Sequence, residues 1–172
     1  MTEQRTAPVQ SRSVSLKELE PIIRETLEAG GCVKLPVTGT SNLPTLAPDR
    51  DQVTLQKAED PLVKGDLPLY KRDSGQFVLH RIVSVGKDGS LCCCGDHQWR
   101  KEAGIRPDQV LGLVTQIRRK DREFSTEHKG YRLWVRLWVF LLPCRWFLVR
   151  VYHLFGRFRR LFVRNRPGPT EK

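Results

Sequence analysis

Six short apolar segments separated by turn signals dominate the sequence between Cys32 and Arg119. They are rich in Val, Leu and Ile, and the stretches between them, such as "APDRD", "KGD", "RDSG" and "GKDG", contain Gly, Pro and Asp. Runs of this length are typical of strands, and tight turns favour antiparallel pairing. The pattern predicts a mainly β (α+β) fold, a compact antiparallel β domain. The segments are CVKLPV, QVTLQ, LPLYK, QFVLHRIVSV, SLCCC and QVLGLVTQIRR.

A helix is predicted before these segments. Ser15 and Glu18 form a capping box, and Gly30–Gly31 ends the helix after about Glu28. The helix and the β segments together would make one domain over residues 14–119. Apolar residues recur at helical spacing within it, namely Leu16, Leu19, Ile22, Ile23 and Leu27.

Three consecutive cysteines follow a predicted hairpin turn at Lys87–Asp88–Gly89. In a strand, Cys93 would point away from Cys92 and Cys94, so one metal ion could not collect all three thiols. We interpret them as small apolar residues of a reduced, cytosolic protein, and we expect no metal or other cofactor.

The C-terminal part is both basic and apolar. The formal net charge is +11, and residues 131–166 contain nine arginines and no acidic residue. We expect a polar linker over residues 120–130 and a helical tail over residues 131–172. After Pro143, arginines recur on one helical face and Leu, Val and Phe on another, as in an amphipathic helix.

Arginines mixed with so many aromatic side chains favour an anionic membrane surface as the partner of the 131–166 tail. Nucleic acid is more usually met by basic residues with less apolar surface, so none is expected as a partner. Two alternatives remain open for the tail: a transmembrane span, which Arg145 would make costly, and packing on the protein itself or on a partner.

The first 13 residues, MTEQRTAPVQSRS, are polar and predict a disordered arm without a secretory signal. Arginine-rich flanks favour the cytosolic side of a membrane. We therefore expect a cytoplasmic protein that is peripherally associated with a membrane.

Ser41 and His80 are the first candidates for chemistry. Ser41, in "VTGTSNLPTL", lies among small and hydroxylated residues, and His80 interrupts the apolar segment "FVLHRIV". A serine becomes nucleophilic when a neighbouring base takes its proton, and histidine suits that task near neutral pH. A turn serine and a hydrogen-bonded core histidine are the structural alternatives.

The motifs around these residues resemble those of type I signal peptidases. "TGTSNLPTL" resembles the family's serine box, G-x-S-M-x-P-T-L, and "KGDLPLYKRDSGQFVLHRIVSV" resembles the strands that lead to its base. "CGDHQWRKE" is similar to the later GD box. The motifs occur in the family's order over about half of the chain, from Val33 to Ile117. "LHRIV" is similar to the branch that uses histidine rather than lysine, within a superfamily that includes LexA-like peptidases.

This resemblance implies Ser41 as the nucleophile and His80 as the general base. Asp96 matches the GD aspartate, and the acidic residue six positions later is Glu102, where the family usually has aspartate. Glu102 is the first candidate to orient the His80 ring. Asp96 is the alternative, although it could equally hold its own turn.

The stretch around Ser41 supplies the candidates for substrate and oxyanion binding: Gly39, Thr40, Asn42 and Pro44. The Ser41 amide, with Thr40 or Gly39 nearby, is expected to bind the developing oxyanion. Asn42 replaces the family's methionine, and Gly39 stands where many members have a hydroxyl. Further candidates for lining a substrate cleft are Arg81, Trp99 and Arg100.

The sequence therefore predicts a signal-peptidase-like serine endopeptidase with a Ser–His–acid site. Its substrate would be a leader or precursor peptide, cleaved at the cytosolic membrane surface. The alternative is a catalytically inactive peptide-binding or membrane-tethered adaptor with the same fold. A LexA-like autoproteolytic regulator is disfavoured, because the lysine base is absent and a single N-terminal helix is too little for a DNA-binding helix pair.

Overall fold

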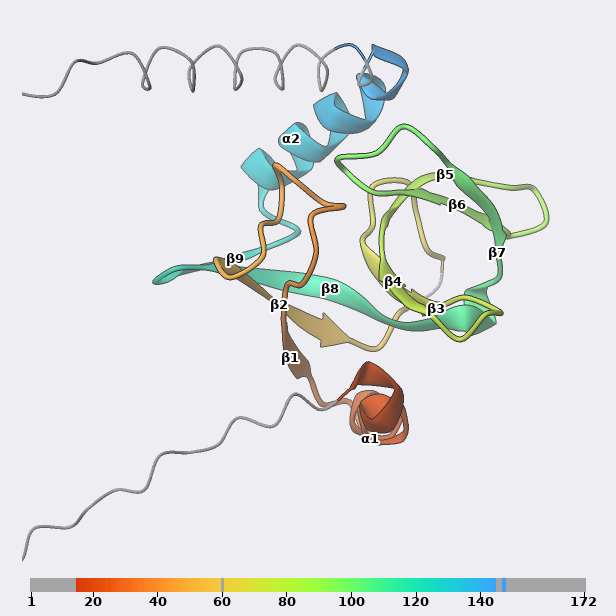
Figure 1. Ribbon diagram of the computed structural model, residues 1–172, viewed down its shortest axis with the longest axis vertical. Coiled ribbons are helices and arrows are strands. Elements are labelled where there is room, and N and C mark those ends of the chain that lie inside the picture. The colour runs from red at the N-terminus through yellow and green to blue at the C-terminus, as the bar shows by residue number, and fades with distance from the viewer. Residues whose placement is uncertain (1–14, 60, 145–146, 148–172) are drawn as a thin grey trace, which may run out of the picture.

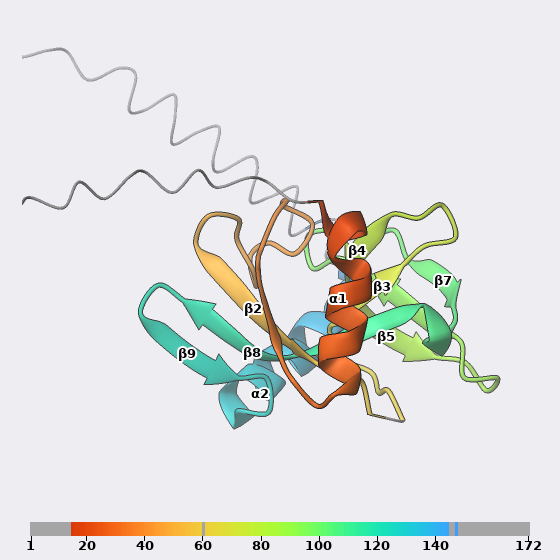
Figure 2. The same cartoon turned by 90° about the horizontal axis from the view of Figure 1, so that it is seen from below.

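Nine strands and two α-helices make up most of the residues that the computed structural model describes, which are 15–59, 61–144 and 147. The strand pairings are antiparallel. The two helices lie on opposite sides of the strands (Figures 1 and 2). The expected class, mainly antiparallel β with an N-terminal helix, is confirmed.

Helix α1, Leu16–Glu28, begins and ends close to the predicted positions. The hydroxyl of Ser15 accepts a hydrogen bond from the Glu18 amide at 3.4 Å, as an N-cap does. Gly30 follows the helix with φ of +79°, a conformation that costs glycine little. Ile23 and Leu27 are buried against the first sheet, so α1 covers one of its faces.

The first sheet has six strands in the order β1-β2-β8-β3-β4, with β9 paired to the C-terminal half of β8. It curls like half of a barrel around its own interior (Figure 1). β8 is its longest strand and pairs with β2, β3 and β9. The strands are β1 (Val33–Pro36), β2 (Asp51–Gln56), β3 (Pro68–Lys71), β4 (Phe77–Leu79), β8 (Val110–Arg119) and β9 (Arg122–Ser125).

The second sheet has the order β5-β6-β7, with β5 at Arg81–Val85, β6 at Leu91–Cys94 and β7 at Glu102–Ile105. β5 and β6 form the predicted hairpin. The apolar segment that contains His80 was predicted as one strand, but it is split at His80. Its first half is β4 in one sheet and its second half is β5 in the other.

Three apolar clusters connect the layers in series. The first joins α1 to the first sheet, the second joins the two sheets, and the third joins the second sheet to α2. Cys93 belongs to the middle cluster, whereas Cys92 and Cys94 belong to the third. The predicted alternation of these three side chains along a strand is confirmed.

Helix α2, Lys129–Phe140, begins inside the segment predicted as a linker, and β9 also lies in that segment. Val135 and Val139 bury one face of α2 against the second sheet. A short 3-10 helix, Leu142–Cys144, follows. Another one-turn helix, Pro107–Gln109, precedes β8.

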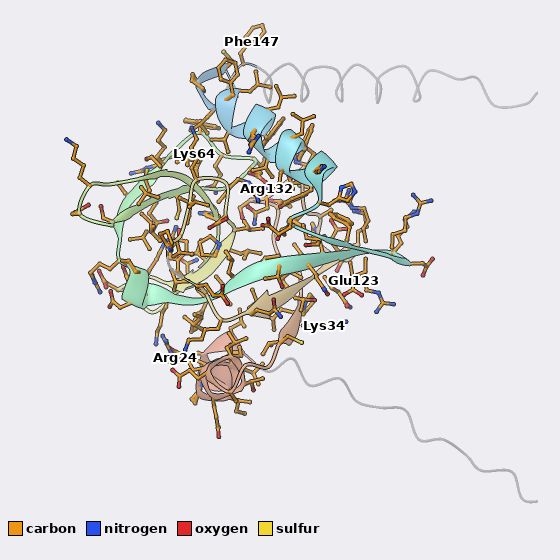
Figure 3. The ribbon with its side chains drawn as sticks, turned by 180° about the vertical axis from the view of Figure 1, so that it is seen from behind. Arg24, Lys34, Lys64, Glu123, Arg132 and Phe147 are labelled. Carbon is orange, nitrogen blue, oxygen red and sulfur yellow. The ribbon has the colours of Figure 1, made fainter. Side chains whose placement is uncertain are left out.

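The opposite face of α2 is exposed. Leu133, Leu137 and Phe140 are 68%, 50% and 78% exposed, and Phe147 is also exposed. Figure 3 shows Arg132 near the start of α2 and Phe147 beyond its end. The predicted arginine stripe beyond Pro143 and the predicted N-terminal arm lie outside the described residues. Within the described ranges, no helix combines the length and the apolar character needed to cross a membrane.

Candidate active site

Ser41 lies in the loop of residues 37–50, which we call the serine loop and which connects β1, at the edge of the first sheet, to its neighbour β2. A turn in which the Leu43 amide donates to the Thr40 carbonyl at 3.2 Å places Ser41 at its bend. Ser41 is half-buried, whereas Gly39 and Thr40 before it are exposed. The serine is therefore accessible on a loop whose two ends are anchored by strands.

Asp51, the first residue of β2, anchors the far end of this loop. Its buried carboxylate accepts hydrogen bonds from the Ala47 amide at 2.9 Å and from the side chains of Arg50 and Arg119. Burial alone would raise the pKa of Asp51, but these hydrogen bonds hold the pKa below its usual range. The carboxylate stays ionised and keeps the loop closed.

His80 occupies the single residue between β4 and β5, at the point where the chain passes from one sheet to the other. Its side chain is buried, and its ring meets that of Tyr70 edge-on with 6.5 Å between centroids. Asn42 donates a hydrogen bond from Nδ2 to the carbonyl of Leu79 at 2.6 Å. The residue after the serine is thus bonded to the residue before the histidine.

The turn after β6 contacts the serine loop and approaches His80. The His97 amide donates to the Ser41 carbonyl at 2.8 Å, and the Asp96 amide donates to Oδ1 of Asn42 at 3.4 Å. A Cβ added to Gly95 would lie 2.5 Å from the Ser41 carbonyl oxygen and 3.1 Å from His80 Nε2. Only a residue without a side chain allows this approach.

Ser41 and His80 line the same cavity, of about 560 Å³, which we call the serine cavity. The two residues are 39 positions apart along the chain, and the structure brings them together. Among the described residues, no hydrogen bond joins the Ser41 hydroxyl to the His80 ring. The rest of the lining is largely apolar and comes from α1, β1, β2, β3 and β4.

His80 also lines a second cavity, of about 510 Å³, which we call the basic cavity. Ser41 does not line it, and Glu102 does, so His80 forms part of the wall of both cavities. The remaining lining residues of the basic cavity are Arg72, Gln98, Trp99, Arg100 and Lys101.

The Glu102 carboxylate is held by β3 and the residue that follows it. Arg72 donates to both of its oxygens, at 2.6 Å each, and the Tyr70 hydroxyl donates to Oε2 at 2.9 Å. The hydrogen bonds from Arg72 lower the pKa of Glu102. Glu102 is therefore a fixed negative charge near His80, with both oxygens already bound by other side chains.

Burial lowers the pKa of His80 below its ordinary value, because the imidazolium loses hydration. The charge of Glu102 opposes this shift, and the charge of Arg72 adds to it. The imidazole is therefore neutral at neutral pH, which is the form that can accept a proton.

Asp96, the alternative orienting acid, is turned toward Arg81. The guanidinium of Arg81 donates to both carboxylate oxygens, and both side chains are almost completely buried. Arg81 also donates to the carbonyl of Gly65 and to the hydroxyl of Tyr131. Arg81 was expected to line a substrate cleft, and that prediction is wrong because the side chain is 1% exposed.

Helix α2 contacts the serine loop and the turn after β6. Trp138 donates from Nε1 to the carbonyl of Asp96 at 3.0 Å, and Trp134 donates to the hydroxyl of Thr45 at 3.3 Å. The two indole rings stack with 5.2 Å between centroids. Pro44 faces this side too, in a groove with Trp134, and does not line the serine cavity.

Several of these residues could not be predicted from local patterns. Arg72 and Tyr70 lie within the stretch "KGDLPLYKRDSGQFVLHRIVSV", but no role was expected for them, and it is the fold that brings them to Glu102. The bridging role of Asn42 was missed, since it was expected to contact substrate. Trp99 and Arg100 were named from their proximity to the GD box, and both line the basic cavity. Within the described part of the chain, no group of three or more His, Cys, Asp or Glu side chains could hold a metal ion.

Comparison of the chain with protein-family models, with curated proteins and with solved structures found no significant match.

Proposed function

We propose that the chain is a serine endopeptidase of the signal-peptidase-like type, with Ser41 as nucleophile and His80 as general base. The observation that carries the proposal is that Ser41 and His80 line one cavity and pack around the same glycine, Gly95. A buried imidazole kept neutral at the wall of an accessible cavity is suited to accept a hydroxyl proton.

In the proposed reaction, His80 takes the proton of the Ser41 hydroxyl as the oxygen attacks the carbonyl carbon of a peptide bond. The C–N bond then breaks, and the imidazolium gives its proton to the leaving amine. Water then attacks the acyl-serine while His80 takes a proton from the water. The imidazolium gives this proton to the serine oxygen, which regenerates the hydroxyl and releases the acid. Rotation of the Ser41 side chain toward the ring would form the hydrogen bond that starts the cycle, since such bonds often tighten only with substrate bound.

Glu102 would act on His80 through its charge, because both of its oxygens are bound by Arg72 and Tyr70. A negative charge near the ring stabilises the imidazolium that forms in the transition state. We assign Asp96 a structural role instead, because Arg81 occupies its carboxylate. Gly39 and Thr40, two exposed residues of the serine loop, remain the candidates for binding the oxyanion, although neither lines the serine cavity.

The substrate would be an extended peptide with apolar side chains. The serine cavity is lined by residues of β1 and β4, which are edge strands of the curled sheet. Edge strands carry unpaired amides and carbonyls, so an extended chain can add to either of them. Leu16, Leu19 and Phe77 would contact apolar side chains of that peptide.

A leader or precursor peptide at the cytosolic membrane surface fits this apolar preference. The exposed face of α2 carries Leu133, Leu137 and Phe140 together with Arg132 and Arg136. Such a mixture of apolar and basic side chains binds anionic membrane surfaces. We propose that this face lies on the membrane while the opposite face holds the site loops.

The membrane proposal is tested with vesicles of phosphatidylcholine, with and without phosphatidylserine. We expect the chain to sediment with the anionic vesicles and Leu137→Glu/Phe140→Glu to reduce the bound fraction severalfold. Val63→Glu, at an exposed apolar residue elsewhere, is the control. Equal binding by all three proteins would contradict the proposal.

A second candidate is a peptide-binding adaptor that keeps the cavity without catalysis. Two observations favour it: no hydrogen bond joins Ser41 to His80, and Glu102 is occupied by Arg72 and Tyr70. The adaptor would bind apolar extended peptides in the serine cavity and would leave them intact.

A fluorophosphonate probe separates the two candidates, because it labels only an activated serine. We expect labelling of the natural chain at Ser41, identified by mass spectrometry. Ser41→Ala should abolish it and His80→Gln should reduce it at least a hundredfold, with circular dichroism unchanged. Ser84→Ala, at an exposed serine of β5, is the matched control. Labelling that is absent, or equal in Ser41→Ala, would reject the peptidase.

A further inference from the structure

The basic cavity lies on the histidine side of the proposed site. His80, Arg72 and Gln98 line both cavities, whereas Ser41 lines only the serine cavity. His80 therefore lies where the serine cavity and the basic cavity adjoin. This arrangement gives the two halves of a bound peptide different surroundings.

The chemistry of acyl transfer decides which half lies where. The base that deprotonates the serine later protonates the leaving amine, so that amine must lie within reach of the imidazole. The residues that follow the cleaved bond continue from this amine. They therefore enter the space beyond His80, which is the basic cavity.

The charges of the basic cavity select what it can hold. Glu102 is balanced by its ion pair with Arg72 at 2.6 Å. Arg100 and Lys101 are exposed, and neither forms an ion pair with any residue that the structure describes. With His80 neutral, the cavity carries an excess of positive charge.

Trp99 adds a flat apolar surface beside these cations. It is 59% exposed, although an indole is usually covered when nothing binds it. An aromatic surface next to unpaired cations suits an acidic peptide segment. Apolar atoms of the peptide would contact the indole, and its carboxylates would contact the cations.

We infer that the basic cavity binds acidic side chains at the first and second positions after the cleaved bond. This inference rests on the proposed peptidase function, because the direction of the peptide follows from the role of His80. Arg100 and Lys101 are then specificity-determining residues. They act through charge, so their effect falls at high salt.

A binding measurement tests the cavity without requiring catalysis. The probes are two product-like peptides with free amino termini, Asp-Glu-Ala-Ala-amide and Asn-Gln-Ala-Ala-amide, titrated into the full chain by calorimetry. We expect the acidic peptide to bind three- to tenfold more tightly at low salt, as two partly exposed ion pairs allow. Arg100→Gln/Lys101→Gln should remove that difference, whereas Lys87→Gln/Arg118→Gln, at exposed cations elsewhere, should keep it. Equal affinity of the two peptides for the natural chain would overturn the inference.

A cleavage measurement tests the direction of binding. A library of proteome-derived peptides is digested with the natural chain, with Arg100→Gln/Lys101→Gln and with Ser41→Ala as background, and the new amino termini are sequenced. We expect Asp and Glu to be enriched at least threefold in the first two positions, and the double variant to lose this enrichment. Ser41-dependent cleavage without the enrichment overturns the inference and leaves the peptidase standing. No Ser41-dependent cleavage, with selective binding of the acidic peptide, rejects the peptidase and the assigned direction and leaves an acidic-peptide site.

Discussion

The guanidinium of Arg81 donates to both carboxylate oxygens of Asp96, at 2.9 and 2.6 Å, in an almost fully buried ion pair. Arg81 follows His80 in the chain, and Asp96 lies in the turn that contacts the Ser41 carbonyl. The pair therefore joins β5, which directly follows His80, to the turn that supports Ser41. The relative placement of Ser41 and His80 therefore depends in part on this buried interaction, in addition to the hydrogen bonds of Asn42.

Removing one partner of this pair should be costly, because it leaves an uncompensated buried charge. We expect Arg81→Met and Asp96→Leu each to lower the free energy of unfolding by about 3–5 kcal/mol. Urea titration followed by tryptophan fluorescence measures the change. The double variant should cost clearly less than the two single changes together. Single variants as stable as the natural chain would show that the pair contributes nothing.

The charges around His80 predict opposite shifts from two neighbouring substitutions. Glu102→Gln removes a negative charge that favours the imidazolium, so the pKa of His80 should fall further. Arg72→Gln removes a positive charge and leaves Glu102 unbalanced, so the pKa should rise. Proton NMR titration of the histidine ring signals measures both, with His80→Gln to assign the resonance. Shifts of the same sign in the two variants would contradict this electrostatic arrangement.

The lowered pKa of His80 also sets the pH dependence of labelling by the fluorophosphonate probe. Only the neutral ring can act as a base, and its pKa lies below the ordinary value of 6.5. The labelling rate should therefore be level above about pH 7 and fall as the pH drops through the pKa of His80. The pKa of His80 is lower in the folded state than in the unfolded state, so protonation favours unfolding. The contribution of the neutral ring to stability is therefore present above pH 6.5 and is lost as the pH falls through the folded-state pKa. A labelling rate that keeps rising from pH 7 to 9 would indicate a different base.

Asn42 should be a positioning residue that affects reactivity more than stability. Asn42→Leu removes the hydrogen bonds to the Leu79 carbonyl and from the Asp96 amide, at a cost of about 1–3 kcal/mol. We expect the labelling rate at Ser41 to fall at least tenfold while the chain remains folded at 20 °C.

Ile117→Val is the matched comparison for Asn42→Leu. It should cost about 0.5–1.5 kcal/mol in the fully buried core on β8. Its labelling rate should stay within twofold of the natural chain. If both variants label at similar rates, the loss in Asn42→Leu is one of general stability.

Much of the fold follows from local patterns. The cap at Ser15 and the apolar strand segments appear directly in the sequence, because side-chain periodicity and turn residues act locally. Strands β7 and β9 could not be predicted in that way. "EAGI" and "REFS" have little intrinsic preference for a strand, and they become strands by pairing with the edges of β6 and β8.

The candidate site shows the same division. Ser41 and His80 were proposed from residue type and motif, which can be recognised without knowledge of the fold. The environment of the site depends on register: Arg72 reaches Glu102 across 30 positions of sequence. Arg81 was placed in a cleft because it lies beside the candidate base, yet its side chain is buried and paired with Asp96.

Trp134 and Trp138 limit how far the chain can be shortened from its C-terminal end. Cutting before Lys129 would strip away the indole donors that reach Thr45 and Asp96, along with the Tyr131 hydroxyl that Arg81 contacts. Cutting after Cys144 would keep all three. Helix α2 is thus part of the minimal folding unit, and the boundary for trimming falls beyond it.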